Sequence, residues 1–171
     1  GRTLGILGYG ELGQAVGRLA EAFGMRVLVG ALPGREREGR PALEQFLPEV
    51  DVLSLHCPLT EATRDLIGAP ELALMKPGSL VINAGRGGLV NEAALAAALR
   101  SGHLGGAACD VLTVEPPVDG NPLLDTDVPN LVITPHSAWG SREARQRIVE
   151  QLRENLLGFA DGQMLRQVGI C

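Results

Sequence analysis

Short apolar runs alternate along this chain with longer segments whose apolar residues recur at helical spacing. The apolar runs predict six strands, at residues 3–7, 26–29, 51–55, 79–83, 106–110 and 130–134. The remaining periodic segments predict helices at about residues 12–23, 42–47, 70–75, 92–100 and 141–160. Strands that alternate with helices form βαβ units, so we expect an α/β fold with a doubly wound, mostly parallel sheet and helices on both faces.

The ends of these elements carry recognisable signals. Asn91 is a favourable N-cap for the helix at 92–100, and Gly102 is a favourable residue to end it. The helix at 12–23 has an apolar face, formed by Leu12, Ala15, Val16, Leu19 and Phe23. No regular structure is predicted between residues 111 and 129, and loops of this length usually carry function.

Composition narrows the possible functions. The 171 residues suit a single domain covering residues 1–171, and the low aromatic content of 3 % predicts an aliphatic core. The net charge of −5, with both signs well mixed, gives no basic face for a nucleic acid, and no apolar stretch is long enough for a membrane span. Cys57, Cys109 and Cys171 are too widely spaced for a disulfide framework or a metal site, which favours free thiols in the cytoplasm.

The turn after the first strand is rich in glycine. Gly8, Gly10 and Gly13 fit the pattern G-x-G-x-x-G, between a predicted strand and a predicted helix. Gly8 permits a tight turn, Gly10 lets a pyrophosphate approach the backbone, and Gly13 lets the helix pack closely on the strand. Phosphates then lie at the positive end of the helix. The pattern therefore predicts a dinucleotide-binding (Rossmann) domain.

One part of this fingerprint is missing. An acidic residue about 20 positions beyond the glycines normally holds the ribose hydroxyls of NAD. The second strand ends instead in Gly30-Ala31-Leu32, and Ala31 cannot accept those hydrogen bonds. Arg35 and Arg37 follow, and either they meet the 2′-phosphate of NADP or they are solvated loop charges. The cofactor prediction is therefore NAD or NADP.

The other polar residues of interest follow the ends of the remaining strands. Ligands of open α/β sheets bind beyond the carboxyl ends of the strands. The residues found there are His56, Cys57 and Pro58 after the third strand, Arg86 after the fourth, Asp110 and Glu115 after the fifth, and His136 after the sixth. We expect them to lie along one edge of the sheet.

These stretches resemble a known family. Residues 83–90 (NAGRGGLV), 110–116 (DVLTVEP) and 134–139 (TPHSAW) are similar to the three signature stretches of the D-2-hydroxyacid dehydrogenases, and residues 56–60 (HCPLT) to the family's turn after the third strand. The resemblance covers essentially the whole chain and is greatest to the glycerate dehydrogenase and hydroxypyruvate reductase members. It implies an oxidoreductase that transfers hydride between NAD(P)(H) and a small D-2-hydroxy or 2-keto acid.

The resemblance implies three catalytic residues. His136 would be the general acid/base, because an imidazole titrates near neutral pH. Glu115 would hold the other ring nitrogen and favour the protonated imidazole. Arg86 would bind the substrate carboxylate with its forked guanidinium and polarise the carbonyl.

The resemblance also implies residues that contact the cofactor. Asp110 would accept a hydrogen bond from the nicotinamide carboxamide. Backbone groups of Cys57, Pro58 and Ala84 would line the cofactor. Glu11 and Leu12 would lie over the pyrophosphate.

This chain departs from the family in its length. Family members carry a separate substrate domain, which is essentially absent from residues 1–171. We therefore expect cofactor binding without useful turnover from this chain, as from an excised domain or a proteolytic remnant. Dimerisation through the cofactor domain, giving a homodimer, is implied by the resemblance. The alternative function is a nucleotide-sensing interaction protein, like the corepressors that resemble this family.

Overall fold

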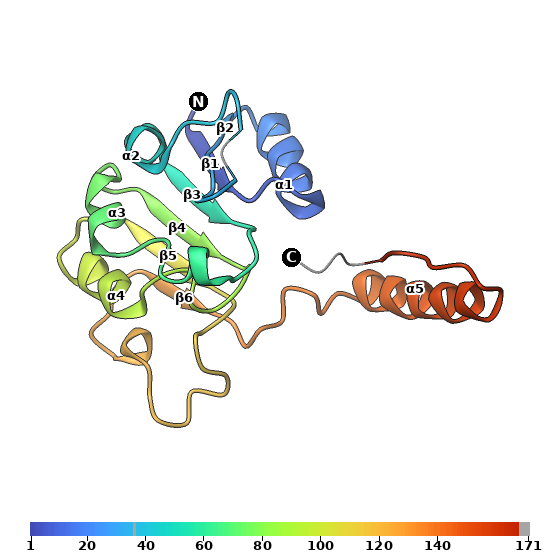
Figure 1. The fold of residues 1–171 in the computed structure, drawn as a ribbon. Coiled ribbons are helices and arrows are strands. Elements are labelled where there is room, and N and C mark those ends of the chain that lie inside the picture. Colours follow the sequence, from blue (N-terminus) through green and yellow to red (C-terminus); the bar gives the residue numbers. More distant parts are fainter. Residues whose placement is uncertain (36, 168–171) are drawn as a thin grey trace. The chain divides into compact units, whose positions relative to one another are not determined.

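The computed structural model describes residues 1–35 and 37–167. The chain separates into two compact units, Gly1–His136 and Ser137–Cys171, which are described separately below. The first unit holds the sheet and every predicted site residue. Figure 1 shows its strands side by side, with helices flanking them.

All six predicted strands are present, each within about a residue of its predicted ends. The strands are β1 (Thr3–Leu7), β2 (Arg26–Val29), β3 (Val52–Leu55), β4 (Leu80–Asn83), β5 (Gly106–Cys109) and β6 (Leu131–Ile133). The α-helices are α1 (Glu11–Ala22), α2 (Leu43–Phe46), α3 (Ala69–Leu74), α4 (Glu92–Arg100) and α5 (Arg142–Ala160). Short 3-10 helices are η1 (Leu47–Glu49), η2 (Glu61–Thr63) and η3 (Pro122–Leu124).

The strands form one parallel sheet in the order β2-β1-β3-β4-β5-β6. From β1 the chain first adds β2 on one side of the sheet. It then crosses back and adds β3 to β6 on the other side, so the strand order reverses between β1 and β3. Such a reversal opens a crevice at the carboxyl ends of the two strands. The doubly wound α/β fold is therefore confirmed.

Two apolar clusters hold the sheet between its helices. The larger lies between the sheet and α2, α3 and α4, and is built around aliphatic residues and Phe46. The smaller joins β1 to α1 through Leu4, Ile6 and Ala20. The mixture of aliphatic side chains with few aromatics agrees with the composition.

Helix α1 does not turn its large apolar residues towards the sheet. Leu12, Leu19 and Phe23 are 72 %, 62 % and 85 % exposed, whereas Gly13 and Gly17 are buried. The reason is the short distance between helix and strand: a Cβ on Gly13 would overlap the carbonyl oxygen of Gly8. Small residues fit best in a helix packed this closely, so of the predicted apolar face Val16 packs against the β1 cluster while Leu12, Leu19 and Phe23 stay exposed.

One helix end agrees with the sequence prediction, and one loop does not. The Asn91 side chain accepts a hydrogen bond from the Ala94 N–H at 3.0 Å, which confirms the predicted N-cap. The loop after β5, predicted to be irregular, contains η3. The side chain of Asn121 starts this turn by accepting from the Leu123 N–H at 2.9 Å.

The second unit is dominated by α5, which Ser141 caps by accepting from the Ala144 N–H at 3.1 Å. Among the described residues, no helix is both long enough and apolar enough to cross a membrane.

Asp51 joins the start of β3 to two other elements. Its carboxylate accepts from the buried Thr3 N–H at 2.7 Å and from Lys76 Nζ at 3.1 Å. The Thr3 hydrogen bond, followed by Lys76, lowers the pKa of Asp51. A lowered pKa means that the carboxylate stabilises the fold above the unfolded-state pKa near 4, and that this contribution is lost as pH falls through the folded-state value.

Replacing Asp51 by alanine is expected to lower the free energy of unfolding by about 1–3 kcal/mol at pH 7, because the Thr3 N–H is left unpaired. Urea unfolding at several pH values measures this, and the difference from wild type should shrink below about pH 4. Glu49→Ala, which removes an exposed ion pair with Arg26, is the control and should cost less than about 1 kcal/mol. A similar loss of unfolding free energy in both variants would contradict the stabilising role assigned to Asp51.

Candidate active site

The register of the sheet aligns the ends of five strands. Leu7, Leu55, Asn83, Cys109 and Ile133 are paired in sequence across β1, β3, β4, β5 and β6. With neighbouring strands about 4.8 Å apart, this row spans about 19 Å. Every loop expected to carry site residues starts within a few residues of this row, so the predicted residues do share one edge.

The turn after β1 is shaped by close backbone contacts. Gly8 has φ +93°, which favours glycine, and an added Cβ would overlap the backbone nitrogen of Cys57. Gly10 differs, because an added Cβ would meet nothing within 4 Å. Among the described residues no side chain caps the start of α1 at Gly10. Open space beside uncapped N–H groups fits a pyrophosphate.

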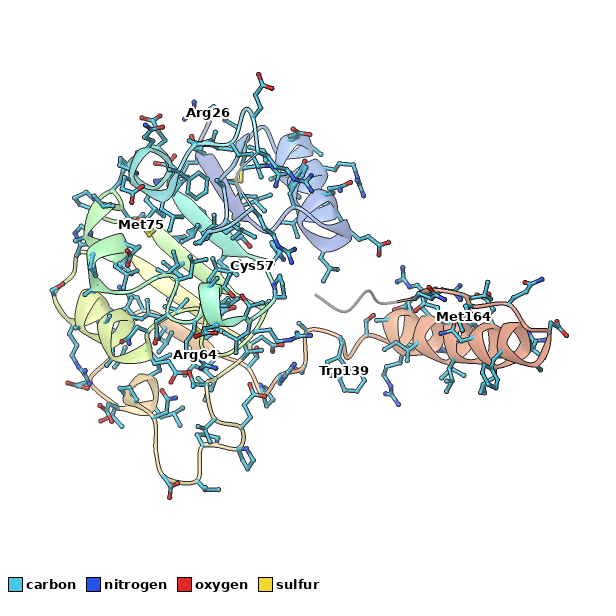
Figure 2. The ribbon with its side chains drawn as sticks, viewed as in Figure 1. Arg26, Cys57, Arg64, Met75, Trp139 and Met164 are labelled. Atoms are coloured by element: carbon cyan, nitrogen blue, oxygen red, sulfur yellow. The ribbon has the colours of Figure 1, made fainter. Side chains whose placement is uncertain are left out.

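The residues predicted to flank this turn are at its surface or behind it. Glu11 and Leu12 are exposed in the first turn of α1, and Pro58 is exposed after β3. Cys57, labelled in Figure 2, is 2 % exposed, and burial raises the pKa of its thiol to about 11. Its thiol is therefore neutral at physiological pH.

The loop after β2 places Ala31 in the interior. Ala31 is 7 % exposed and donates its N–H to the carbonyl of Pro41 at 2.9 Å. Leu32 and Arg35 bracket a tight turn, closed by the Arg35 N–H and the Leu32 carbonyl at 3.0 Å. Arg35 and Arg37 are exposed. The intervening Glu36, part of the alternating charges here, lies outside the described residues.

His136 and Glu115 form the closest contact between predicted catalytic side chains. His136 Nδ1 lies 2.6 Å from Glu115 Oε2, and the other oxygen of Glu115 accepts from the Leu112 N–H at 2.7 Å. The bond to His136, and then that to Leu112, lower the pKa of Glu115. Glu115 is therefore ionised at neutral pH and can hold a protonated imidazole. His136 has φ +50°, an unusual conformation for a residue with a side chain.

Asp110 is buried just after the end of β5. It is 7 % exposed, its carboxylate accepts from the Thr134 hydroxyl, and its N–H donates to the Asn83 carbonyl at 2.9 Å. These contacts join the ends of β4, β5 and β6. Thr134 was not predicted as a site residue, although it lies in the same signature stretch as His136.

Arg86 follows β4 in a loop that Asn83 shapes. The Asn83 amide donates to the Arg86 carbonyl at 2.9 Å and accepts from the Gly85 N–H at 3.1 Å. The guanidinium is exposed, and its Nη1 donates to the Gly85 carbonyl at 2.7 Å. Ala84 is exposed beside it. Among the described residues Arg86 makes no carboxylate ion pair.

Two contacts bring the Arg86 loop and the Glu115 loop together. A Cβ on Gly87 would overlap the carbonyl of Leu112, so the two loops touch through their backbones. Glu92, in the first turn of α4, accepts from the Thr113 N–H and from Asn121 Nδ2, both at 2.7 Å. Glu92 was missed by sequence reasoning, because an acidic residue in a first helical turn is expected for helix stability alone.

A cavity of about 550 Å³ adjoins the histidine. Its walls are proline and aliphatic side chains of residues 112–135, with Glu115 and His136 among them. The geometry thus combines a carboxylate–imidazole pair, a nearby cavity and an exposed guanidinium on an adjoining loop. This set can bind a small carboxylate and move a proton.

Comparison with known proteins identifies the family. Residues 1–138 match the model for the D-isomer specific 2-hydroxyacid dehydrogenase, NAD binding domain. The chain belongs to this family. The glycine turn, Arg86 and the His136–Glu115 pair all lie in the matched residues, and the match confirms the family resemblance seen in the sequence.

Individual relatives and solved structures agree with this family assignment. A glycerate dehydrogenase of Methylorubrum extorquens is 50 % identical over 163 residues, covering 95 % of this chain and 51 % of the relative. The crystal structure of a Thermus thermophilus protein has a TM-score of 0.84 and 44 % identity, covering 99 % of this chain and 54 % of that one. A D-isomer specific 2-hydroxyacid dehydrogenase of Xanthobacter autotrophicus, crystallised with NADPH and MES, has a TM-score of 0.79 and 35 % identity, covering 98 % and 71 %.

The chain thus spans about half the length of the curated relatives it matches. The names of these relatives are those of dehydrogenases and reductases. They give no support to a corepressor-like sensing protein.

Proposed function

We propose that this chain forms the cofactor half of an NAD(P)-dependent D-2-hydroxyacid dehydrogenase acting on a small substrate such as glycerate or hydroxypyruvate. The observation that carries the proposal is the 2.6 Å contact between His136 and Glu115, on the same sheet edge as the open glycine turn. An ionised carboxylate that orients an imidazole is an arrangement for general acid/base work. The name of the M. extorquens relative supports glycerate as substrate.

His136 donates a proton to the substrate oxygen when the 2-keto acid is reduced, and takes it back when the hydroxy acid is oxidised. The proton passes through Nε2, because Glu115 holds Nδ1. The nicotinamide, when bound, supplies or accepts the hydride at the substrate C2. Glu115, whose own pKa is lowered by its bond to His136, is ionised and keeps the ring oriented through Nδ1.

Arg86 binds the substrate carboxylate. Its exposed guanidinium offers two parallel N–H groups to the two oxygens, which orients the neighbouring carbonyl for reaction. Asp110 accepts from the nicotinamide carboxamide, and its bond from Thr134 holds its carboxylate in place. The backbones of Ala84, Cys57 and Pro58 would line the cofactor, and Glu11 and Leu12 would lie beside its pyrophosphate.

The cofactor preferred by this chain is NADP. Ala31 has no carboxylate to accept from the ribose hydroxyls, and its methyl group is buried. Arg35 and Arg37 are exposed in the loop that follows. The similar Xanthobacter structure with NADPH shows that the family includes proteins that bind this cofactor.

Purified chain titrated with NADH and with NADPH tests the proposal. Nicotinamide fluorescence should show binding of both, with NADPH tighter by about tenfold or more, because a phosphate gains charge-assisted hydrogen bonds. The same sample should reduce hydroxypyruvate too slowly to measure, since the chain spans only about half the length of its relatives. Binding of neither cofactor, a strong NADH preference, or robust turnover would each contradict one part of the proposal.

The chain's partners and location follow from the family and the thiols. We place the whole protein in a homodimer, as the resemblance implies. The exposed apolar residues of α1, Leu12, Leu19 and Phe23, are available for such contacts. Cys57 and Cys109 are buried free thiols, which suits the reducing cytoplasm.

A further inference from the structure

The loop after β2 carries another arginine, Arg40, whose side chain is held over an aromatic ring. Its guanidinium carbon Cζ lies 5.9 Å from the centroid of the Tyr9 ring. This distance fits a cation–π contact. Arg40 is also partly buried, whereas Arg35 and Arg37 are exposed. Arg40 therefore has a defined position before any ligand arrives.

The ring beneath Arg40 belongs to the glycine turn. Tyr9 stands between Gly8 and Gly10 and packs beside the apolar cluster that joins β1 to α1. Its Oη would lie 3.3 Å from a Cβ added to Gly17, so the ring closely covers the middle of α1. Arg40 thus rests on a part of the fold that cannot move without moving the phosphate-binding turn.

Backbone contacts bring Arg40 back to the end of β2. Its N–H donates to the Arg37 carbonyl at 3.1 Å. The carbonyl of the next residue, Pro41, accepts from the Ala31 N–H at 2.9 Å. The guanidinium therefore lies between the end of β2, where an acid would hold the ribose hydroxyls, and the turn that binds the pyrophosphate.

Among the described residues, the charge at this position has no ion-pair partner. Arg26, Arg100 and Arg166 each pair with a carboxylate. Within residues 1–35 and 37–167, no carboxylate forms an ion pair with Arg40. A fixed, partly buried cation of this kind favours an anionic ligand group.

We propose that Arg40, held on Tyr9, binds the 2′-phosphate of NADP and selects this cofactor over NAD. The inference rests on the proposed preference for NADP and names the residue responsible. A guanidinium donates two hydrogen bonds to a phosphate, whereas the 2′-hydroxyl of NAD offers it no charge. Arg35 and Arg37 can add charge, but their exposed side chains must be ordered on binding, which weakens their contribution. Tyr9 is a positioning residue.

Binding of cofactors and of their adenosine fragments to the purified 171-residue chain tests the role of Arg40. NADH and NADPH are titrated by nicotinamide fluorescence, and adenosine 2′,5′-bisphosphate and AMP by competition against NADPH. Arg40→Gln should weaken the binding of NADPH and of the bisphosphate by about tenfold to a hundredfold. The affinities for NADH and AMP should change by less than about twofold. Tyr9→Leu should weaken NADPH several-fold in the same selective way, and Tyr9→Phe should not.

Arg18→Gln, which removes an exposed arginine from α1, is the matched control and should change none of these affinities. Thermal unfolding without cofactor verifies that each variant is folded. A wild type that prefers NADPH, with a preference that Arg40→Gln leaves unchanged, overturns the role of Arg40 and leaves the NADP proposal standing. An equal loss of NADH and NADPH assigns Arg40 to the shared adenosine and also overturns it. A wild type that prefers NADH overturns both proposals.

Discussion

Replacing Gly10 by valine is expected to abolish cofactor binding while leaving the fold intact. The site of Gly10 is open, with no protein atom within 4 Å of an added Cβ, and the valine side chain would fill the space where the pyrophosphate approaches the backbone. The backbone there is extended, with φ −81° and ψ −161°, which any residue adopts. Losing two charge-assisted hydrogen bonds should weaken both NADH and NADPH by about a hundredfold or more. Nicotinamide fluorescence and thermal unfolding measure the two effects.

Gly13→Ala separates ligand effects from folding effects. Its added methyl overlaps the Gly8 carbonyl, so this variant should lose stability as well as binding. Gly10→Val should cost no more than about 1 kcal/mol of stability, the scale of a weakened N-cap. Unchanged cofactor affinity in Gly10→Val would show that the dinucleotide does not bind at this turn.

Replacing His136 by asparagine is expected to lower kcat by about a hundredfold to ten-thousandfold, the usual range for a general acid/base. Asparagine is chosen because it tolerates the positive φ of +50° found at this position. Turnover requires a substrate domain, so the assay uses a chimera. In it, residues 1–171 replace the matching segment of the M. extorquens glycerate dehydrogenase, and oxidation of D-glycerate is followed.

The control for His136 is the same substitution at His103. That ring contacts the Leu72 carbonyl at 2.9 Å and lies before β5, away from the carboxyl edge. His103→Asn should leave kcat nearly unchanged, and both variants should bind NADH as the parent chimera does. A His136→Asn chimera that binds NADH and retains full kcat would exclude the proposed acid/base role.

Local patterns were sufficient for the strands and most helix ends. Runs of aliphatic residues bounded by Gly, Pro and Asn mark buried parallel strands, and the N-cap at Asn91 is a local interaction between near neighbours. Helix α1 is a case that the local pattern does not predict. Its apolar stripe suggests one buried face, yet the contact between Gly13 and the Gly8 carbonyl requires another.

The sequence predicts the candidate site as a set of residues but not as an arrangement in space. The strand-end rule places Arg86, Asp110, Glu115 and His136 on one edge, which the strand register agrees with. The residues that hold these side chains and their loops in position come from distant parts of the chain. Glu92 holds the loop after β5 from α4, and Arg40 lies over Tyr9 from the loop after β2. No local signal marks either residue.

The sequence by itself determined the parallel α/β class, the glycine turn, the missing acid at Ala31 and the family. Each depends on residue types at short spacings, where backbone conformation and side-chain chemistry act locally. Only the tertiary structure decided which face of α1 is buried, that Glu115 lies 2.6 Å from His136, and that Arg40 is fixed beside the phosphate turn. These are contacts between segments far apart in the chain, and they depend on packing distances that residue spacing does not contain.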